Sequence, residues 1–314
     1  MAERINGQVS EALIIHNSFA GIKDKSREVN EAAELLASRI RRVEILRTEG
    51  PGHATELALE AIREGYLHIV VAGGDGTLRE VAAGAVNSKT DITLWPTGSE
   101  EMARRDLKMP RNLLRAVDIV TNGKVQVIDT GAVNGETFLF NAGIGADADV
   151  VYGVQKPRLK KDGHGVTTYL KQARRILPRT GGVLAKLTID GEICFTDKLY
   201  QFWVNNGRRL ARFSVTKGDI DDGKYEVLLA FAEKLSQLIF PGAIALATGK
   251  NSNQFTRMTA SNMDIDLGRA RKVQVDGDPL ASSDHFEVRM YPSSLRMRVP
   301  NVENAIYSKP SISE

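Results

Sequence analysis

The stretch IVVAGGDGTLREV, residues 69–81, combines three glycines with one carboxylate at the end of an apolar run. Gly73, Gly74 and Gly76 allow backbone conformations that are closed to other residues and let backbone N–H groups come close to a ligand. A phosphate suits such a loop, and the N-terminus of the helix that follows would attract it too. Asp75 would repel that phosphate unless a cation bridges them, or unless the carboxylate accepts a hydrogen bond from a hydroxyl group.

The loop matches neither of two common nucleotide-binding glycine motifs. No Gly-Lys-Ser/Thr follows it, and Arg79 stands where a dinucleotide fingerprint has its third glycine. We expect Thr77 to cap a helix over residues 77–87. Mg²⁺ is the bridging ion that we favour for Asp75, because it typically binds one or two carboxylates together with phosphate oxygens. A tight structural turn is the alternative interpretation.

Alternating strand and helix patterns predict an α/β domain that positions this loop. Buried strands are expected over 12–17, 43–48, 68–73 and 91–96, with helices over 24–42, 53–65 and 77–87. Short loops between them imply a parallel sheet with right-handed crossovers. The glycine loop then lies at the carboxyl end of a strand, where open α/β sheets bind ligands. We assign residues 1–130 to this layered nucleotide-binding domain.

Hairpin patterns replace this alternation from about residue 131. Asn134-Gly135 and Asp190-Gly191 each stand between two extended runs, as in two-residue hairpin turns. Further short strands follow, with helices expected near 165–177 and 233–248. We predict an antiparallel β-sandwich-like domain over residues 131–314, and we expect the tail after residue 291 to return to the first domain.

Composition and charge exclude several classes of protein. Of 314 residues, 42% are hydrophobic and 26% charged, as in folded soluble proteins. A single cysteine, Cys194, fits a reducing compartment. The first ten residues are polar, and the longest apolar patch, 238–247, is shorter than the roughly 20 residues that span a bilayer. We therefore expect a cytoplasmic protein that is at most peripherally attached to a membrane.

Basic residues are clustered although the net charge is only +3, which is too small to indicate nucleic-acid binding. The clusters are Lys156, Arg158, Lys160 and Lys161, and the segment GRRLAR at 207–212. A solvated surface is the simpler interpretation of both, and contact with an anionic membrane or a nucleic acid is the alternative, at about 1 kcal/mol per basic residue near an anionic leaflet. The five histidines share no metal-ligand spacing, and the sequence does not indicate an oligomeric state.

Seven segments carry a resemblance to a known family. GGDGT resembles the nucleotide-binding loop of the diacylglycerol kinase, sphingosine kinase and NAD kinase superfamily, and the other six resemble segments of the bacterial diacylglycerol-kinase-like lipid kinases. These six are HNSFAG (16–21), RTEGPGHATELA (47–58), WPTGSEEMARRDLKMP (95–110), FNAGIGADADV (140–150), GDIDDGKYEVLL (218–229) and VQVDGDP (273–279). The downstream Thr-Gly-Ser-Thr and the Asn-Glu pair typical of NAD kinases are not found.

The resemblance implies a two-domain, ATP-dependent kinase that binds the nucleotide between its domains and phosphorylates a lipid hydroxyl at the membrane surface. By motif position, ATP would be held by Asn17, Gly21, Thr48, Gly74, Asp75, Gly76, Thr77, Arg79 and Ser99. The family's Mg²⁺ site maps onto the Asp222 carboxylate with groups at Asp219 and Lys224. Without a metal, the same segment is an acidic turn.

Asp278 and Asp75 are the catalytic residues that the resemblance implies. A carboxylate that accepts the proton of the attacking hydroxyl typically contributes about 10²- to 10⁴-fold. The family places a glutamate at this position, so Asp278 is one methylene shorter, and Asp276 is an alternative base. A plain hairpin turn is the structural alternative for VDGD.

Further departures from the family pattern bear on activity. Ser18 replaces the proline of the first turn, Glu101 replaces an asparagine near the expected phosphates, and Arg79 replaces another asparagine. Arg79 could pair with Glu101 or bind phosphate directly. Without such compensation Glu101 would repel ATP, so a non-catalytic nucleotide- or lipid-binding relative is the second hypothesis. A kinase of a soluble substrate is the third, and the sequence does not name the lipid.

Overall fold

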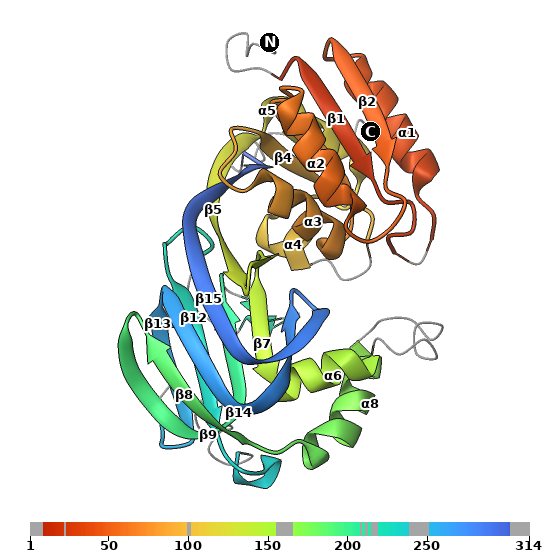
Figure 1. Ribbon diagram of the computed structural model, residues 1–314. Helices are drawn as coiled ribbons and strands as arrows, with labels where there is room; N and C mark the ends of the chain where they lie inside the picture. The colour runs from red at the N-terminus through yellow and green to blue at the C-terminus, as the bar shows by residue number, and fades with distance from the viewer. Residues whose placement is uncertain are drawn as a thin grey trace, which may run out of the picture. The chain divides into compact units, whose positions relative to one another are not determined.

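The computed structural model describes residues 9–21, 23–98, 102–154, 166–207, 209–210, 213–214, 219–238 and 251–301 (Figure 1). The contacts divide the chain into two compact units. The first comprises Met1–Ile128 and Leu295–Glu314, and the second comprises Asp129–Ser294. The first unit ends at Ile128, close to the boundary that we placed after residue 130. The chain from Leu295 is grouped with the first unit.

A parallel sheet forms the middle of the first unit. Its strands are β1 (Glu11–His16), β2 (Arg42–Arg47), β3 (His68–Gly73), β4 (Asp91–Pro96) and the last residues of the long strand β15 (Asp278–Val299). Their order is β2–β1–β3–β4–β15, and each pairing is parallel. β3 and β4 are buried along their whole length, which is the reason for their continuous apolar sequences.

Helices connect these strands, and two of them differ from the prediction. The helices are α1 (Ser26–Ala37), α2 (His53–Arg63), α3 (Asp75–Ala85), α4 (Met102–Asp106) and α5 (Leu113–Asn122). α1 ends at Ala37 and not at residue 42, because the chain turns there to enter β2. α3 begins at Asp75, with Gly74 as its N-cap, so Thr77 lies inside the first turn and is not the cap that we expected.

The core of the first unit lies where α1 and α5 cover one face of the sheet. Val29 and Leu36 of α1 and Val117 of α5 pack with the buried side chain of Trp95 at the end of β4. Alternate residues of β1 point to this core, and Leu13 and Ile15 between them are buried on the opposite face. Both faces of the sheet are thus covered, as in layered α/β folds.

A buried ion cluster attaches β15 to the first unit. Asp91 at the start of β4 is 1% exposed, and its two carboxylate oxygens lie 2.8 Å from Arg296 Nε and 3.2 Å from Arg298 Nε. Arg298 also donates to the carbonyl oxygens of Val120 and Gly123, at the end of α5. These contacts fix the returning chain beside β4, where Arg296 pairs in register with Asp91.

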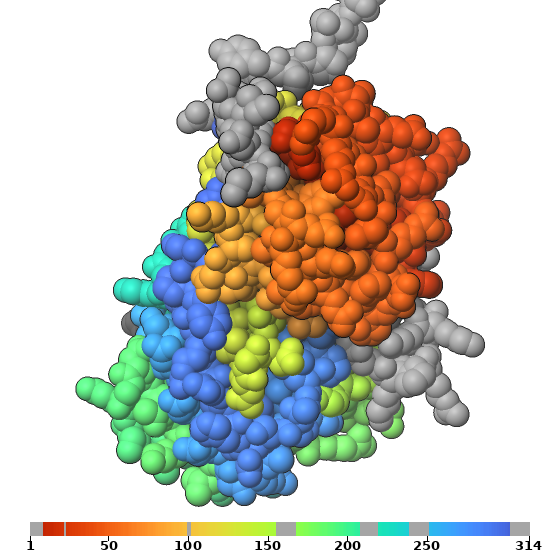
Figure 2. Space-filling view, turned by 45° about the horizontal axis from the view of Figure 1, so that its top comes forward, coloured from red at the N-terminus to blue at the C-terminus, as the bar shows by residue number. Residues whose placement is uncertain are grey.

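The second unit is strand-rich, as predicted, and its main sheet is antiparallel. Its strands are β5 (Lys124–Val133), β6 (Glu136–Phe138), β7 (Asn141–Gly145), β8 (Val183–Ile189), β9 (Glu192–Asn205), β12 (Tyr225–Phe231), β13 (Phe255–Ala260), β14 (Asn262–Val275) and most of β15. A separate short ribbon consists of β10 (Arg209–Leu210) and β11 (Phe213–Ser214). The order is β13–β12–β9–β7–β14–β15, with β8 also between β9 and β14 and with β5 on β15. Figure 2 shows β14 and β15, in blue, at the surface of this unit.

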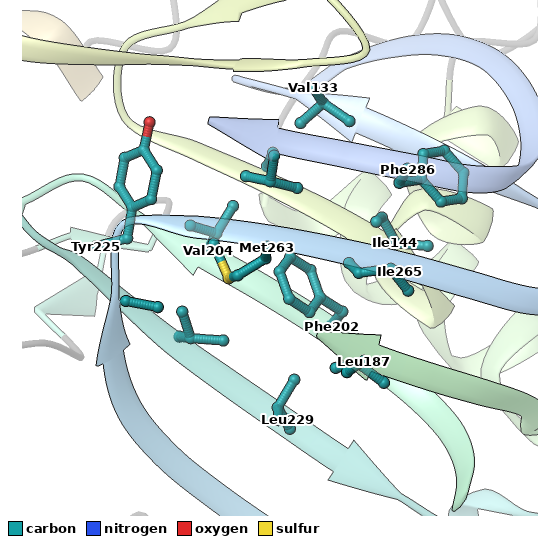
Figure 3. Close-up of a cluster of buried hydrophobic side chains, with 14 of the residues drawn as sticks. Val133, Ile144, Leu187, Phe202, Val204, Tyr225, Leu229, Met263, Ile265 and Phe286 are labelled. Carbon is teal, nitrogen blue, oxygen red and sulfur yellow. The ribbon is translucent and has the colours of Figure 1, made fainter. Parts of the chain in front are cut away.

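Apart from the β10–β11 ribbon, the strands of the predicted sandwich-like domain are hydrogen-bonded into one sheet, which curls. The hydroxyl of Tyr225 on β12 lies 3.1 Å from the carbonyl oxygen of Thr130 on β5 and 2.9 Å from that of Arg289 on β15. Its ring packs on Phe138 of β6, with centroids 5.3 Å apart. Strands distant in the sheet order are therefore in contact, and the buried apolar cluster lies along the sheet (Figure 3).

Three hairpins of this unit have the expected turn chemistry. The pairs Asn134-Gly135, Asp190-Gly191 and Asp276-Gly277 have positive φ at both residues, between 48° and 91°. Two-residue turns with this geometry match the twist of the strands that they join.

Helices interrupt the sheet between β7 and β8. They are α6 (Ala146–Val154), α8 (Val166–Ile176) and the short 3-10 turn η1 (Leu177–Arg179). α8 agrees with the helix expected near 165–177. Of the helix expected over 233–248, residues 233–238 are described and contain the 3-10 turn η2 (Leu235–Gln237), and the rest lies outside the described part of the chain.

Replacing Asp91 with alanine is expected to destabilise the protein by about 3–5 kcal/mol, because it leaves the guanidinium of buried Arg298 without its carboxylate partner. Chemical denaturation followed by circular dichroism measures the change. Asp118→Ala is the matched control, since Asp118 is exposed and its pair with Arg39 should contribute less than about 1 kcal/mol. Equal effects of the two variants would contradict the role of the buried cluster.

Candidate functional site

The loops that follow β1, β2, β3 and β4 emerge at one edge of the parallel sheet. Backbone hydrogen bonds continue past the strands: Asn17 N–H donates to Ala72 O at 2.9 Å, and Thr48 N–H donates to His16 O at 3.0 Å. Thr97 N–H likewise donates to Gly73 O at 3.0 Å. The carboxyl ends of the four strands are therefore level with one another. This edge is where ligands bind in open α/β sheets.

Glycines let three of these loops meet at backbone contact. Gly21 has φ +88°, and a Cβ on it would lie 2.5 Å from Thr97 O. A Cβ on Gly98 would lie 2.5 Å from the Cα of Gly74. The loops after β1, β3 and β4 thus touch without intervening side chains. Gly21 and Gly74 are both predicted nucleotide-binding residues. They lie on either side of the Thr97–Gly98 segment, because Gly21 packs against Thr97 and Gly74 packs against Gly98.

Asn17 connects the first loop to helix α3. Its Nδ2 donates to Thr77 Oγ1 at 3.0 Å, and its Oδ1 accepts from Phe19 N–H at 3.0 Å. Gly74, the N-cap of α3, has no side chain that could cap the helix. Backbone N–H groups of the first turn, which includes Gly76, consequently lack a side-chain cap, and such a helix end favours an anion. Thr77, expected to cap α3, is a buried acceptor for Asn17.

Asp75 has a structural partner that the sequence did not indicate. Its Oδ2 accepts from Met102 N–H and its Oδ1 from Ala103 N–H, both at 3.0 Å. The carboxylate therefore satisfies the first backbone donors of α4, as an N-terminal capping group does. As the first residue of α3, it also stands where a negative charge suits the helix dipole. The carboxylate of Asp75 thus attaches helix α4 to the glycine loop.

Three residues of the prediction remain, namely Arg79, Ser99 and Glu101. Arg79 lies on α3 and is partly buried. Ser99, expected to hold ATP, and Glu101, for which pairing with Arg79 was one alternative, lie outside the described residues. His16, at the end of β1, is buried, and burial lowers its pKa, with the nearby charge of Arg47 acting in the same direction.

The acidic turn of the second unit is organised by hydrogen bonds around Asp222. Its carboxylate accepts from Asp219 N–H at 3.1 Å and from Lys224 N–H at 3.0 Å. The predicted metal residues Asp219, Asp222 and Lys224 are thus adjacent in one turn. Within the described part of the chain, no group of three His, Cys, Asp or Glu side chains could hold a metal ion. The carboxylate set for Mg²⁺ is therefore not complete in the described side chains alone.

Asp129 supports this turn and was missed by the sequence analysis. It is 1% exposed, and its carboxylate accepts from Gly223 N–H and Ser293 N–H, each at 2.7 Å. Its own N–H donates to Ile220 O at 2.7 Å. Asp129 lies more than 90 residues before the turn, so no local pattern could have indicated the contact.

The VDGD segment is a two-residue hairpin turn between β14 and β15. The carboxylate of Asp276 accepts from the N–H groups of Leu139, Phe140 and Asn141 at 2.7–2.9 Å. Asp276 is therefore an anchor for the β6–β7 connection and a poor alternative base. Asp278 pairs with Val275 across the turn and is partly exposed.

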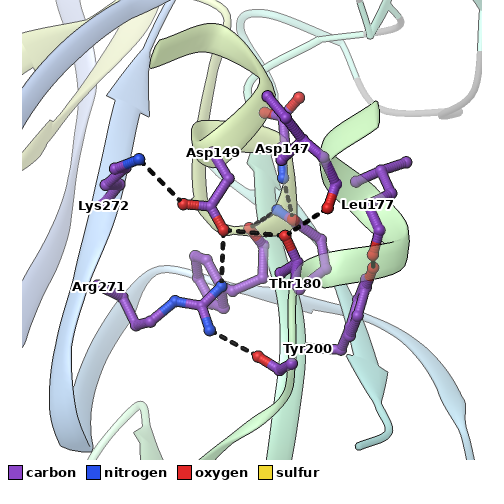
Figure 4. A network of polar contacts seen from close by, with 11 residues as sticks. Asp147, Asp149, Leu177, Thr180, Tyr200, Arg271 and Lys272 are labelled. Carbon is purple, nitrogen blue, oxygen red and sulfur yellow. Dashed lines mark hydrogen bonds and ion pairs between the residues drawn. The ribbon is translucent and has the colours of Figure 1, made fainter. Parts of the chain in front are cut away.

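The carboxylate of Asp149 on α6 is the centre of a second polar network. Asp149 Oδ2 lies 3.1 Å from Thr180 Oγ1 and 3.3 Å from Arg271 Nη2, and its Oδ1 lies 3.5 Å from Lys272 Nζ (Figure 4). Arg271 also donates to Gly181 O at 2.6 Å. Asp149 thus attaches α6 to β14 and to the chain that follows η1.

Comparison with known proteins agrees with the motif resemblance. Residues 11–133 match the diacylglycerol kinase catalytic domain. Diacylglycerol kinase of Bacillus subtilis (strain 168) is 26% identical over 273 residues, which cover 85% of this chain and 89% of that protein. Diacylglycerol kinase of Staphylococcus aureus (strain MRSA252) is 27% identical over 231 residues, covering 72% of each chain.

Solved structures show the same two-domain fold. A diacylglycerol kinase from Bacillus anthracis str. Sterne superposes with a TM-score of 0.69 at 21% identity, over 93% of this chain and 97% of that one. An NAD kinase from Archaeoglobus fulgidus, crystallised in complex with ATP, superposes with a TM-score of 0.51 at 13% identity, over 95% and 96% of the chains.

The diacylglycerol kinase match confirms the predicted resemblance and has a defined extent. It contains the four loops at the sheet edge, with Asn17, Thr48, Asp75 and Thr77. The acidic turn and the VDGD hairpin lie beyond it.

Gly98→Ala is expected to weaken binding of Mg·ATP at least tenfold and to destabilise the protein by about 1–3 kcal/mol, because the new Cβ overlaps Gly74. Titration calorimetry and thermal unfolding measure the two effects. Gly50→Ala is the control, since Gly50 follows β2 and has open space around its Cα. Unchanged nucleotide affinity in Gly98→Ala would contradict the importance of the loop contact.

Proposed function

We propose that this protein is an ATP-dependent lipid kinase that phosphorylates the hydroxyl of a diacylglycerol-like lipid alcohol. The observation that carries the proposal is the contact of three glycine-bearing loops at the carboxyl edge of a parallel sheet, within the segment matching the diacylglycerol kinase catalytic domain. The names of the curated relatives support a phosphotransferase, and the lipid acceptor is part of the proposal.

ATP is the nucleotide that we propose for this edge. The bare N-terminus of α3 and the closely packed loop backbones favour its phosphates. The residues assigned to it are those of the sequence prediction: Asn17, Gly21, Thr48, Gly74, Asp75, Gly76, Thr77, Arg79 and Ser99. The NAD kinase that shares the fold was crystallised with ATP, which is consistent with nucleotide use in this fold.

Mg²⁺ is the proposed metal cofactor. Asp75 would bind it beside the phosphates, and the turn of Asp219, Asp222 and Lys224 would carry the separate metal site that the resemblance implies. The carboxylates of Asp75 and Asp222 each accept two backbone hydrogen bonds. Because a carboxylate has about four lone-pair sites, two such hydrogen bonds do not prevent Asp222 from binding a cation or its water ligands. When bound, Mg²⁺ offsets the phosphate charge that Asp75 would otherwise repel.

Asp278 is the proposed general base. It accepts the proton of the lipid hydroxyl while that oxygen forms a bond to the γ-phosphorus and the bond from this phosphorus to the leaving oxygen of ADP breaks. Asp276 is less suited, because its carboxylate is engaged with three backbone N–H groups. A rigid two-residue turn next to Asp278 favours accurate placement of the base, which phosphoryl transfer requires.

Peripheral contact with a membrane is proposed through α8. Leu170 on this helix is 55% exposed, and Lys171, Arg174 and Arg175 are exposed beside it. An exposed apolar side chain among basic ones suits the interface of an anionic bilayer. No helix in the described residues is long and apolar enough to cross a membrane.

Transfer of ³²P from [γ-³²P]ATP to a total lipid extract, followed by mass spectrometry of the product, tests the function. Asp278→Asn is expected to lower kcat about 10²- to 10⁴-fold with little change in KM for ATP, since it removes the proton acceptor. Asp278→Glu, which introduces the family's residue, is expected to retain activity. Absence of transfer by the wild type, or full activity of Asp278→Asn, would contradict the proposal, and absence of Mg·ATP binding would favour a non-catalytic relative.

Leu170→Glu is expected to weaken binding to vesicles of phosphatidylcholine with anionic phosphatidylglycerol at least threefold. The substitution removes apolar area and adds a negative charge, which the anionic lipid repels. Vesicle co-sedimentation at low and high salt measures the effect. Leu114→Glu on α5 is the matched control, since Leu114 is similarly exposed at 46%. Equal losses in both variants would argue against a specific contact through α8.

A further inference from the structure

Gln274 on β14 has its whole side-chain amide engaged in the interior of the second unit. The residue is 2% exposed. Its Oε1 accepts from Gly277 N–H at 2.8 Å, and its Nε2 donates to Asn141 Oδ1 at 3.0 Å and to Asp147 Oδ2 at 2.9 Å. One amide thus connects the hairpin turn before Asp278 to β7 and to α6.

Two side chains hold the turn from different positions. Asp276, the first turn residue, is anchored by its carboxylate to backbone N–H groups of residues 139–141. Gly277, the second, is held by Gln274. Asp276 and Gly277 have φ +48° and +89°, so the turn also has little freedom to adopt another backbone geometry. Asp278 follows directly, and its direction depends on both attachments.

The space for this arrangement is created by Gly143 in β7. A Cβ at this position would lie 2.6 Å from Asp147 Oδ2 and 2.9 Å from Gln274 Nε2. Any side chain here would displace the pair. The contact between Gln274 and Asp147 therefore explains why Gly143, the central residue of the NAGIG segment, is a glycine.

Asp147 completes the support of Gln274. Its Oδ1 accepts from the hydroxyl of Tyr169 on α8 at 2.5 Å. Burial raises the pKa of Asp147, and its hydrogen bonds with Tyr169 and Gln274 oppose that shift. Tyr169 and Gln274 thus both donate to this carboxyl group, and a displaced Gln274 would remove one of its hydrogen bonds, which is costly.

We infer that Gln274 is a positioning residue for the reaction, which sets the direction of Asp278 by holding Gly277 and is itself held by Asn141 and Asp147. The inference rests on the proposed function, in which Asp278 accepts the proton. An aspartate reaches less far than the family's glutamate, so its placement depends more strongly on the turn. A displacement of about 1 Å at a reacting group can cost about 100-fold in rate.

Two substitutions separate hydrogen bonding from packing. Gln274→Met keeps the size of the side chain and removes all three hydrogen bonds, whereas Gln274→Glu keeps the acceptor for Gly277 N–H. For Gln274→Met we expect kcat to fall about 10- to 100-fold, with KM for Mg·ATP within about twofold of the wild type. For Gln274→Glu we expect kcat to stay within about fivefold of the wild type, because the new carboxyl group keeps the bond to the turn and shares a proton with the adjacent Asp147.

Hydrogen exchange of the Gly277 amide, measured by NMR, provides a readout that does not depend on activity. It should accelerate at least tenfold in Gln274→Met and stay slow in Gln274→Glu. The amide of Gly191, in the Asp190-Gly191 turn of the same unit, should be unchanged in both variants. Tyr225→Phe is the stability control, since it removes a buried hydrogen bond to Thr130 or Arg289 and none of the hydrogen bonds of Gln274, and it should lower the melting temperature without changing kcat.

The outcomes distinguish this inference from the proposed function. If the wild type is active and kcat of Gln274→Met lies within twofold of the wild-type value, the role of Gln274 is overturned. The kinase assignment would then remain intact. The role of Gln274 would be overturned in the same way if Tyr225→Phe lowered kcat as much as Gln274→Met. If the wild type transferred no phosphate to any lipid, the proposed function would itself be wrong.

Discussion

Close backbone packing of glycine-bearing loops is the constraint on which the site of the first unit depends. A Cβ on Gly98 would lie 2.5 Å from Gly74 Cα, and one on Gly21 would lie 2.5 Å from Thr97 O. The loops can therefore touch only without side chains. Gly74 also has no side chain that could cap the N-terminus of α3. The lack of a side chain at Gly74 therefore permits both the close packing of the loops and the binding of an anion at this helix end.

Carboxylates act as anchors for backbone donors in both units. Asp75 accepts from two N–H groups of α4, Asp129 from Gly223 and Ser293, and Asp276 from three successive residues. Loops that must approach a ligand leave N–H groups without strand or helix partners, and a charged acceptor satisfies several of them at once. An aspartate in a motif can thus have a structural task besides any catalytic one.

Curling of the antiparallel sheet determines the interior of the second unit. Tyr225 joins β12 to β5 and β15 although several strands separate them in the sheet order. Burial raises the pKa of its hydroxyl, which stays protonated and able to donate. The closed interior also encloses polar groups, among them Gln274 and Asn141, which must bond with each other because water is excluded.

Local patterns in the sequence were sufficient for the elements and for the family resemblance. The strand ranges 68–73 and 91–96 were predicted correctly, because a strand buried on both faces is a continuous apolar run. Asn-Gly and Asp-Gly turns were found for a similar reason, since two residues with positive φ need these types. The spacing of GGDGT and the other segments was sufficient for the resemblance to diacylglycerol kinases.

Only the tertiary structure decided what the motif side chains contact. Asp75 was expected beside a metal and caps α4, 27 residues later, and Thr77 was expected as a cap and accepts from Asn17, 60 residues earlier. The single curled sheet also depends on contacts such as Tyr225 with Thr130, 95 residues apart. Such contacts leave no periodic trace in the chain, because a hydrogen bond depends on where two segments meet in space and not on their spacing along the sequence.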